Sequence, residues 1–188
     1  MTGVQTCALP IYPENGPLSY AWDLDGNGSF ETPGQTATFS ARNLRAPATR
    51  TIAVRATDDG GLTATDSATV KVIWNFTGFF QPVDNPPVFN VVKAGRGVPV
   101  RFSLDGFQGF GIFTPGHPRS ETIACDPTQE DPIEETVPAL VSVLLYNPFN
   151  DRYTFVWKTS GAWAETCRRL VFELDDGTTH TANFRFTR

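Results

Sequence analysis

Apolar and polar residues alternate with a period of two along several short stretches of the chain. The longest stretch, residues 62–72, has an apolar residue at every second position except Asp66, with threonine, serine or lysine between. Residues 51–56 show the same alternation, and the turn sequence Asp58-Asp59-Gly60-Gly61 separates the two stretches. Because side chains of a strand alternate between the two faces of a sheet, the pattern predicts two half-buried antiparallel strands joined in a β-hairpin.

Shorter stretches of the same kind occur along the rest of the chain. No segment shows the 3.6-residue period of an amphipathic helix, so the sequence predicts an all-β fold throughout. The remaining predicted strands cover residues 20–24, 36–41, 98–104, 153–157, 170–174 and 182–186.

Composition narrows the class of protein. The 188 residues include 15 Lys and Arg against 20 Asp and Glu, and the formal charge of −5 argues against a generic nucleic-acid binder, which needs a basic face. A hydrophobic content of 40% is enough for a folded core. No stretch approaches the roughly 18 consecutive apolar residues of a membrane span. The length predicts one or two small domains.

Three segments in the first part of the chain carry a family resemblance. They are Tyr-Ala-Trp-Asp-Leu-Asp-Gly-Asn-Gly at 20–28, Thr-Ile-Ala-Val-Arg-Ala-Thr-Asp at 51–58 and Asp-Ser-Ala-Thr-Val-Lys-Val at 66–72. Their order and spacing resemble the PKD domain. The resemblance implies an immunoglobulin-like β-sandwich that acts as an extracellular spacer or adhesion module. The first strand of that family should precede Tyr12 and is absent, so we expect a truncated module over residues 12–73.

From Trp74 onward the chain is similar to a second family, the PxKF domain. The resemblance implies another β-sandwich, found at the C-terminal end of secreted, mostly actinobacterial proteins and without an assigned activity. Arg101 stands where the family usually has Lys. We therefore expect two consecutive immunoglobulin-like sandwiches, 12–73 and 74–188, from a secreted or cell-surface bacterial protein. The segments that carry the resemblance are Asn-Phe-Thr-Gly-Phe-Phe-Gln-Pro-Val at 75–83, Val-Pro-Val-Arg-Phe-Ser-Leu at 98–104, Trp-Lys-Thr at 157–159, Trp-Ala-Glu-Thr-Cys-Arg at 163–168 and Asn-Phe-Arg-Phe at 183–186.

Residues 1–11, Met-Thr-Gly-Val-Gln-Thr-Cys-Ala-Leu-Pro-Ile, show neither strand alternation nor helical spacing. They resemble translated sequencing-adapter read-through, and a short disordered tail is the alternative interpretation. On either interpretation we expect no contribution to the fold, and on the read-through interpretation we expect any export signal to have been lost upstream.

The three cysteines divide into one in this tail, Cys7, and two in the second domain. Cys125 and Cys167 are 42 positions apart, and they are interpreted either as a disulfide or as two buried thiols in a reducing compartment. Because both family resemblances imply an extracellular location, the disulfide is favoured.

A group of acidic residues suggests a calcium site in the first domain. Asp23, Asp25 and Asn27 place oxygen atoms at positions one, three and five of a loop, as in the first half of a calcium-binding loop. Position twelve is glycine, so the loop is not an EF-hand, but Glu31 and the turn that contains Asp58 are further oxygen donors. The alternative is an acidic turn whose carboxylates accept hydrogen bonds from nearby backbone N–H groups, with no cofactor at all.

Aromatic residues suggest a different kind of site. The run Trp74, Phe76, Phe79 and Phe80 is interpreted either as a platform that stacks on sugar rings or as the first core strand of the second domain with the seam between the two modules. On the platform interpretation, Trp74 and Trp163 are the candidate binding aromatics. The core interpretation is favoured.

The sequence favours a non-catalytic function. The two histidines, His117 and His180, lie in no catalytic motif, and the glycine-rich residues 95–97 and 106–111 open no helix that would bind phosphate. We expect a spacer, adhesion or display region whose partners are other domains of its parent chain and surface proteins or polysaccharide. The alternative is a carbohydrate-binding module that localises a separate catalytic domain.

Overall fold

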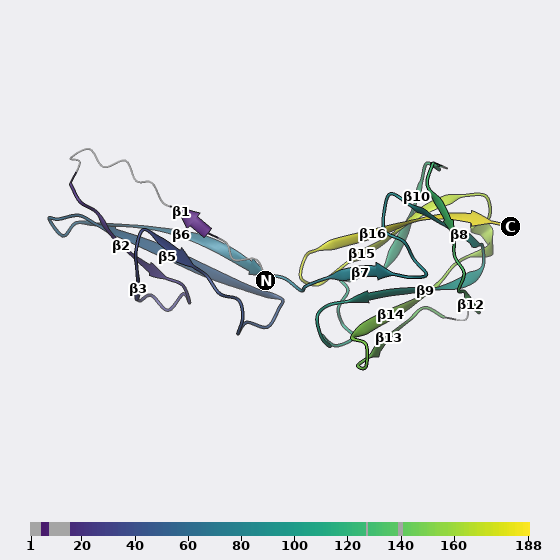
Figure 1. Cartoon of the computed structure of the whole chain (residues 1–188), viewed down its shortest axis with the longest axis horizontal. Coiled ribbons are helices and arrows are strands. Elements are labelled where there is room, and N and C mark those ends of the chain that lie inside the picture. Colours follow the sequence, from purple (N-terminus) through teal and green to yellow (C-terminus); the bar gives the residue numbers. More distant parts are fainter. Residues whose placement is uncertain (1–4, 8–15, 127, 139–140) are drawn as a thin grey trace. The chain divides into compact units, whose positions relative to one another are not determined.

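The computed structural model describes residues 5–7, 16–126, 128–138 and 141–188, and Figure 1 shows its strands. The described chain consists of β-strands and one short 3₁₀ helix, η1 (Gly161–Trp163), which confirms the all-β prediction. Contacts divide the chain into two compact units, Met1–Ile73 (unit 1) and Trp74–Arg188 (unit 2). The division falls where the sequence changes from the first resemblance to the second.

Unit 1 contains an antiparallel four-stranded sheet with the strand order β3-β2-β5-β6. Strands β5 and β6 form the predicted hairpin, and all their residues pair, from Ala48 with Val72 to Thr57 with Thr63. At the turn, the Leu62 N–H donates to the Asp58 carboxylate at 2.7 Å. The bounds are β2 (Ser19–Asp23), β3 (Thr32–Pro33), β5 (Ala48–Thr57) and β6 (Thr63–Val72).

The core of unit 1 is small and centres on Trp22. Its register partner on β5 is Val54, and Ile52 lies on the same face. All three side chains are buried together with Phe39. The Trp22 indole N–H donates to the Gly34 carbonyl at 2.9 Å, so the polar end of the buried ring is satisfied.

The apolar face of β6 is not buried as the alternation predicted. Leu62 is 77% exposed, Ala64 and Ala68 are also exposed, and only Val70 and Val72 are partly covered. The prediction of a half-buried strand is therefore wrong for most of β6. The physical reason is that β6 is an edge strand, and among the described residues no element packs over its first half.

The expectation for the N-terminal tail needs a correction at three residues. Strand β1 (Gln5–Cys7) pairs antiparallel with β4 (Thr36–Thr38), although its sequence has no strand alternation. Backbone pairing uses the N–H and C=O groups that every residue carries, so an edge strand can pair with a segment that lacks any hydrophobic pattern. The rest of the predicted tail lies outside the described residues.

Unit 2 contains two five-stranded sheets. In the first sheet, strand order is β10-β15-β16-β8-β11, and β8 runs parallel to both of its neighbours. Its strands are β8 (Phe89–Lys93), β10 (Arg119–Ile123), β11 (Glu130–Pro132), β15 (Cys167–Glu173) and β16 (Thr179–Thr187).

The second sheet of unit 2 is antiparallel and has the order β12-β9-β14-β13, with β7 also paired to β9. Its strands are β7 (Thr77–Phe80), β9 (Arg96–Ser103), β12 (Val137–Pro138), β13 (Val143–Asn147) and β14 (Arg152–Lys158).

Aromatic rings join the two sheets face to face. Phe102 of β9 is fully buried, and its ring centroid lies 5.3 Å from Phe172 of β15 in an edge-to-face contact. The same ring stacks on Tyr153 of β14 at 5.3 Å. Further along the interface, Trp157 of β14 contacts Phe184 of β16 at 5.0 Å. The alternating residues of β9 and β14 thus form one inner face of a β-sandwich, as their pattern predicted.

The segment after Cys125 crosses from one sheet to the other, because it supplies β11 to the first and β12 to the second. Ion pairs hold it at both places: Glu130 pairs with Arg185, and Glu135 accepts two hydrogen bonds from Arg101 at 2.6 and 2.8 Å. The Arg101 guanidinium also donates to the Gln81 carbonyl. A Lys at position 101 would lack the fork that makes these contacts together.

A disulfide fastens the start of this segment. Cys125 and Cys167 are bonded, with their Cα atoms 5.3 Å apart, so the preferred interpretation of the two cysteines holds in the structure. The bond joins the chain beyond β10 to the first residue of β15.

We predict that Cys125→Ala lowers the free energy of unfolding of unit 2 by about 4 kcal/mol, the loop-closure entropy of a cross-link of this length. Guanidinium unfolding followed by tryptophan fluorescence measures the change, because three of the four tryptophans lie in unit 2. The wild-type chain in dithiothreitol should lose the same amount, and reductant should leave the variant unchanged. An equal stability of variant and oxidised wild type would contradict the prediction.

Candidate functional site

The predicted calcium residues lie in the turn after β2, where Asp23 is almost completely buried. Its carboxylate accepts backbone N–H groups from Gly26 at 2.7 Å, Asn27 at 3.3 Å and Gly28 at 2.8 Å. Burial opposes ionisation of Asp23, but these hydrogen bonds outweigh it and hold the pKa of the carboxyl below its usual range. Asp23 therefore organises the turn as a backbone acceptor.

Two further carboxylates lie close to Asp23. One oxygen each of Asp23, Asp25 and Glu31 fall within 4.8 Å of one another. The Asn27 side-chain amide donates to both Asp25 and Glu31 at 3.1 Å, while its carbonyl oxygen accepts the Ser29 N–H. Asn27 thus presents N–H donors, not an oxygen, to these two carboxylates. This arrangement supports the acidic-turn interpretation.

Asp58 does not belong to this cluster. Strands β2 and β5 are antiparallel, with Asp23 opposite Ala53 and Ser19 opposite Thr57. The turn after β5 therefore lies at the other end of the sheet, roughly 16 Å from Asp23 at about 3.3 Å per residue. The prediction that Asp58 shares an ion with Asp23 is wrong. The turn after β2 and the turn after β5 lie at opposite ends of these two antiparallel strands.

The two candidate binding tryptophans are both engaged in packing. Trp74 is only 7% exposed, and its backbone N–H donates to Asp176 at 2.8 Å. Trp163 of η1 is half-buried against Trp157, and the Arg168 guanidinium lies 4.5 Å from its ring centroid. The core interpretation therefore describes Trp74, whereas Trp163 is a partly covered ring held between Trp157 and Arg168.

The histidines are likewise placed as structural groups. Arg119 donates to Nε2 of His117 at 3.0 Å, and Nδ1 lies 3.0 Å from the Thr114 hydroxyl oxygen. The Glu173 carboxylate lies 3.4 Å from Nε2. His180 stacks on Phe76 with 3.6 Å between ring centroids, and burial lowers its pKa.

The structure brings together an exposed group of aromatic residues that the sequence analysis did not single out. We call Phe107, Phe110 and Tyr146 the rim aromatic cluster. Phe107 lies 5.2 Å from Phe110 in an edge-to-face contact and 4.9 Å from Tyr146, measured between ring centroids. Phe107 is 49% exposed and Phe110 is 60% exposed. Phe149, at the tip of the β13–β14 hairpin that carries Tyr146, is also fully open to solvent.

Hydrogen bonds to Tyr153 and Asp151 hold this cluster in place. The hydroxyl of the buried Tyr153 accepts the Gln108 N–H at 2.6 Å and donates to the Gly109 carbonyl at 2.9 Å. Asp151 accepts hydrogen bonds from the Tyr146 hydroxyl at 2.8 Å and from the Gly106 N–H at 3.0 Å. The loop 106–111 and the β13–β14 hairpin are therefore tied to the same two side chains.

Asp151 is an acceptor suited to this role. Burial opposes its ionisation, but hydrogen bonds from Ser103, Tyr146 and Gly106 together lower its pKa. The charged form is therefore the one that these donors stabilise, and it fixes the hairpin beside the loop at neutral pH.

The sequence carried a weak signal for the cluster. Residues 106–111 read Gly-Phe-Gln-Gly-Phe-Gly, in which two phenylalanines stand in a glycine-rich loop outside any alternating stretch. The glycine pattern of this stretch was tested only against a phosphate-binding loop. No strand is predicted over these residues, so the two phenylalanines have no predicted core in which to be buried, and this is the signal for their exposure.

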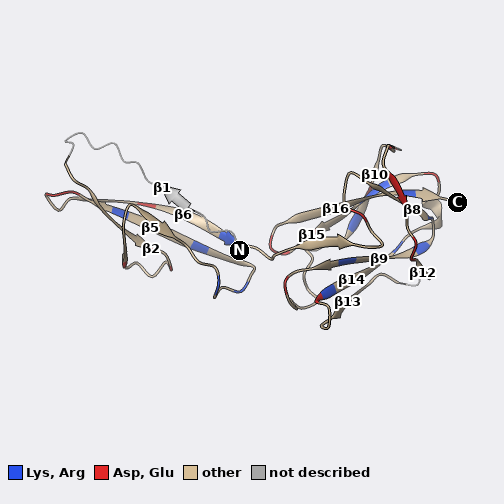
Figure 2. Ribbon diagram, in the orientation of Figure 1, with Lys and Arg blue, Asp and Glu red and all other residues tan. Residues whose placement is uncertain are grey.

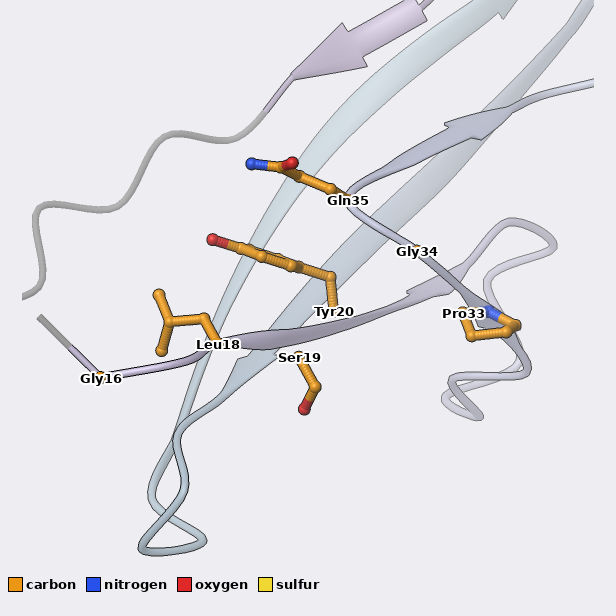
Figure 3. Close-up of a pocket in the computed structure, with 7 residues that line it drawn as sticks. All are labelled: Gly16, Leu18, Ser19, Tyr20, Pro33, Gly34 and Gln35. Carbon is orange, nitrogen blue, oxygen red and sulfur yellow. The ribbon is translucent and has the colours of Figure 1, made fainter.

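A shallow groove lies along β2 of unit 1, and Figure 3 shows Leu18, Tyr20 and Gln35 extending to the same side of it. Pro33 and Gly34 also line it. It contains no acid–base pair and no metal-ligating group, and we assign no function to it.

No protein-family model and no curated protein matches the chain. Among solved structures, the chain is similar to SGBP-B of the Bacteroides ovatus mixed-linkage glucan utilization locus, in complex with a mixed-linkage heptasaccharide. The sequence identity is 12% and the TM-score is 0.28, over 97% of this chain and 40% of that protein. The chain thus spans less than half the length of SGBP-B, and a likeness this low supports no statement about fold or ligand. The PKD and PxKF resemblances stay predictions.

No helix among the described residues has the length and apolar character needed to cross a membrane.

We predict that Asp23→Asn weakens unit 1 at pH 7 because it removes the charge that accepts three backbone N–H groups. The folded pKa lies below the unfolded value of about 3.9, so this stabilisation is present above that pH and is lost as pH falls through the folded pKa. Hydrogen-exchange protection of peptides from β2 and β5 should differ between variant and wild type at pH 7. The difference should shrink at pH 3. Asp59→Asn, in the opposite turn, is the control and should have no such effect.

We also predict that the thermal midpoint is the same in millimolar calcium and in chelator, because the acidic turn is already satisfied by N–H donors. A calcium-dependent rise that Glu31→Gln abolishes would instead show that the carboxylates exchange these donors for an ion.

Proposed function

We propose that the chain is a non-catalytic extracellular adhesion region, in which unit 2 provides the binding surface and unit 1 acts as a spacer. The observation that supports this best is the rim aromatic cluster, whose loop and hairpin are held by part-buried hydrogen bonds to Tyr153 and Asp151. Apolar surface that stays in water lacks the stabilisation of about 25 cal/mol per Å² that its burial would give. Ordered apolar groups on a protein surface are typical of interaction sites.

The disulfide supports the extracellular part of the proposal. Disulfides form and persist in oxidising compartments, and thiols are kept reduced in the cytosol of most organisms. Cys125 is itself exposed, so in a reducing compartment this bond would be open to attack.

Adhesion is preferred to a purely mechanical spacer for one reason. A spacer needs only a stable fold, and Phe107 and Phe110 add little to the core because about half of each side chain is in solvent. The loop that carries them nevertheless uses the hydroxyl of Tyr153 and a backbone contact to Asp151. By binding its partner, this surface would localise the parent chain, including a catalytic domain elsewhere in it.

We predict that the full-length chain is retained on at least one extracellular surface and that Phe107→Ala/Phe110→Ala reduces retention at least tenfold. The measurement is depletion of labelled protein from solution by cellulose, chitin, gelatin-coated beads and phosphatidylglycerol vesicles. Leu62→Ala, which removes an exposed apolar side chain from unit 1, is the control and should be retained like the wild type. Equal behaviour of the wild type and the double variant on all four surfaces would favour a spacer without adhesion.

A further inference from the structure

The rim aromatic cluster also indicates what kind of ligand it binds. The rings of Phe107 and Phe110 meet at 70°, so they form a corner rather than one flat platform. Phe107 is braced from behind by Tyr146 and by the buried Tyr153, whose ring centroid lies 6.3 Å away. The corner is thus a preorganised apolar surface a few ångströms across, which is the size of a single ring of a ligand.

The two segments that carry the corner contain few cations. The loop 104–111 and the hairpin 146–152 contain three ionisable charges, Asp105, Asp151 and Arg152. The Arg152 guanidinium lies 4.0 Å from the centroid of the Phe80 ring and is engaged there. In Figure 2 the Lys and Arg residues of unit 2 are dispersed among its strands. These segments therefore supply one cation, already stacked on Phe80, where a phosphate-rich ligand requires several.

Uncharged hydrogen-bonding groups lie on the same hairpin. Asn147 and Asn150 are exposed and flank Phe149. The Asn147 amide oxygen accepts the Phe149 N–H at 3.0 Å, and its NH₂ group remains a donor at the hairpin tip. The apolar corner, one ring wide, complements a molecule with an apolar C–H face and a hydroxyl-bearing edge. A pyranose ring has both features.

We infer that the rim aromatic cluster binds a neutral polysaccharide, with the C–H face of a sugar ring packed in the corner between Phe107 and Phe110. This inference rests on the proposed adhesion function and names its ligand class. The proposed binding of the sugar is non-covalent and needs no metal or other cofactor. Tyr153 and Asp151 are positioning residues, because they hold the loop and the hairpin without facing the ligand.

The test separates aromatic stacking from general hydrophobic adsorption. Affinity electrophoresis of the full-length chain is run through gels that contain mixed-linkage β-glucan, xylan or mannan, and depletion is measured on cellulose and chitin. We expect retardation or depletion with at least one of these neutral polymers. Phe110→Leu, which keeps an apolar side chain of similar size, should weaken the effect about tenfold, whereas Phe110→Trp should preserve it. Leu62→Ala is the matched control and should behave like the wild type.

Further variants and probes decide the remaining outcomes. Phe107→Leu repeats the test at the second ring, and a thermal midpoint for each variant shows that unit 2 is folded. Equal retention of the wild type and both Leu variants would mean hydrophobic adsorption and would overturn the inference. Retention only on gelatin, on phosphatidylglycerol vesicles or on anionic polygalacturonate, lost in Phe107→Ala/Phe110→Ala, would overturn the glycan inference but leave adhesion standing. Retention on none of these probes would overturn both.

Discussion

The contact of Phe102 with Phe172 across the two sheets of unit 2 is the interaction on which the rest of that unit depends. Phe102 also stacks on Tyr153, so the core connects the sheet interface to a side chain that reaches the rim. The Tyr153 ring belongs to the core, and its hydroxyl holds the loop that carries Phe107 and Phe110. The rim aromatic cluster is therefore held rigid by side chains that are themselves fixed by close packing in the interior.

Unit 1 lacks an interaction of that kind. Its core rests on Trp22 and a few neighbours of one sheet, and most of β6 has no cover among the described residues. Its polar turn compensates locally, because the Asp23 carboxylate accepts hydrogen bonds from three backbone N–H groups of the turn. The two units thus obtain local order by different means, one from ring packing and the other from a buried charge.

The sequence predicted those features that depend on local pattern. Period-two alternation located the strands, the Asp58–Gly61 turn predicted the hairpin, and the Cys125–Cys167 pair was identified with the help of the family resemblances. The pattern did not predict the exposed face of β6, since alternation shows that two faces differ and not that anything covers one of them. It misplaced Asp58, because which turns share an end of a sheet is a property of topology. The pattern did not predict the exposed contact of Phe107 with Phe110, because a loop has no period from which exposure can be inferred.

The parallel pairing of β8 with β16 has a mechanical consequence. The two strands are in register from Phe89 with Asn183 to Lys93 with Thr187, one near the start of unit 2 and the other at its end. Tension that reaches β8 from its N-terminal side and β16 from its C-terminal side pulls them past each other along their length. The hydrogen bonds between them are then loaded together in shear instead of being opened one after another, as they would be in a hairpin pulled from its open end. A domain built in this way resists extension in the direction in which a tether would be stretched.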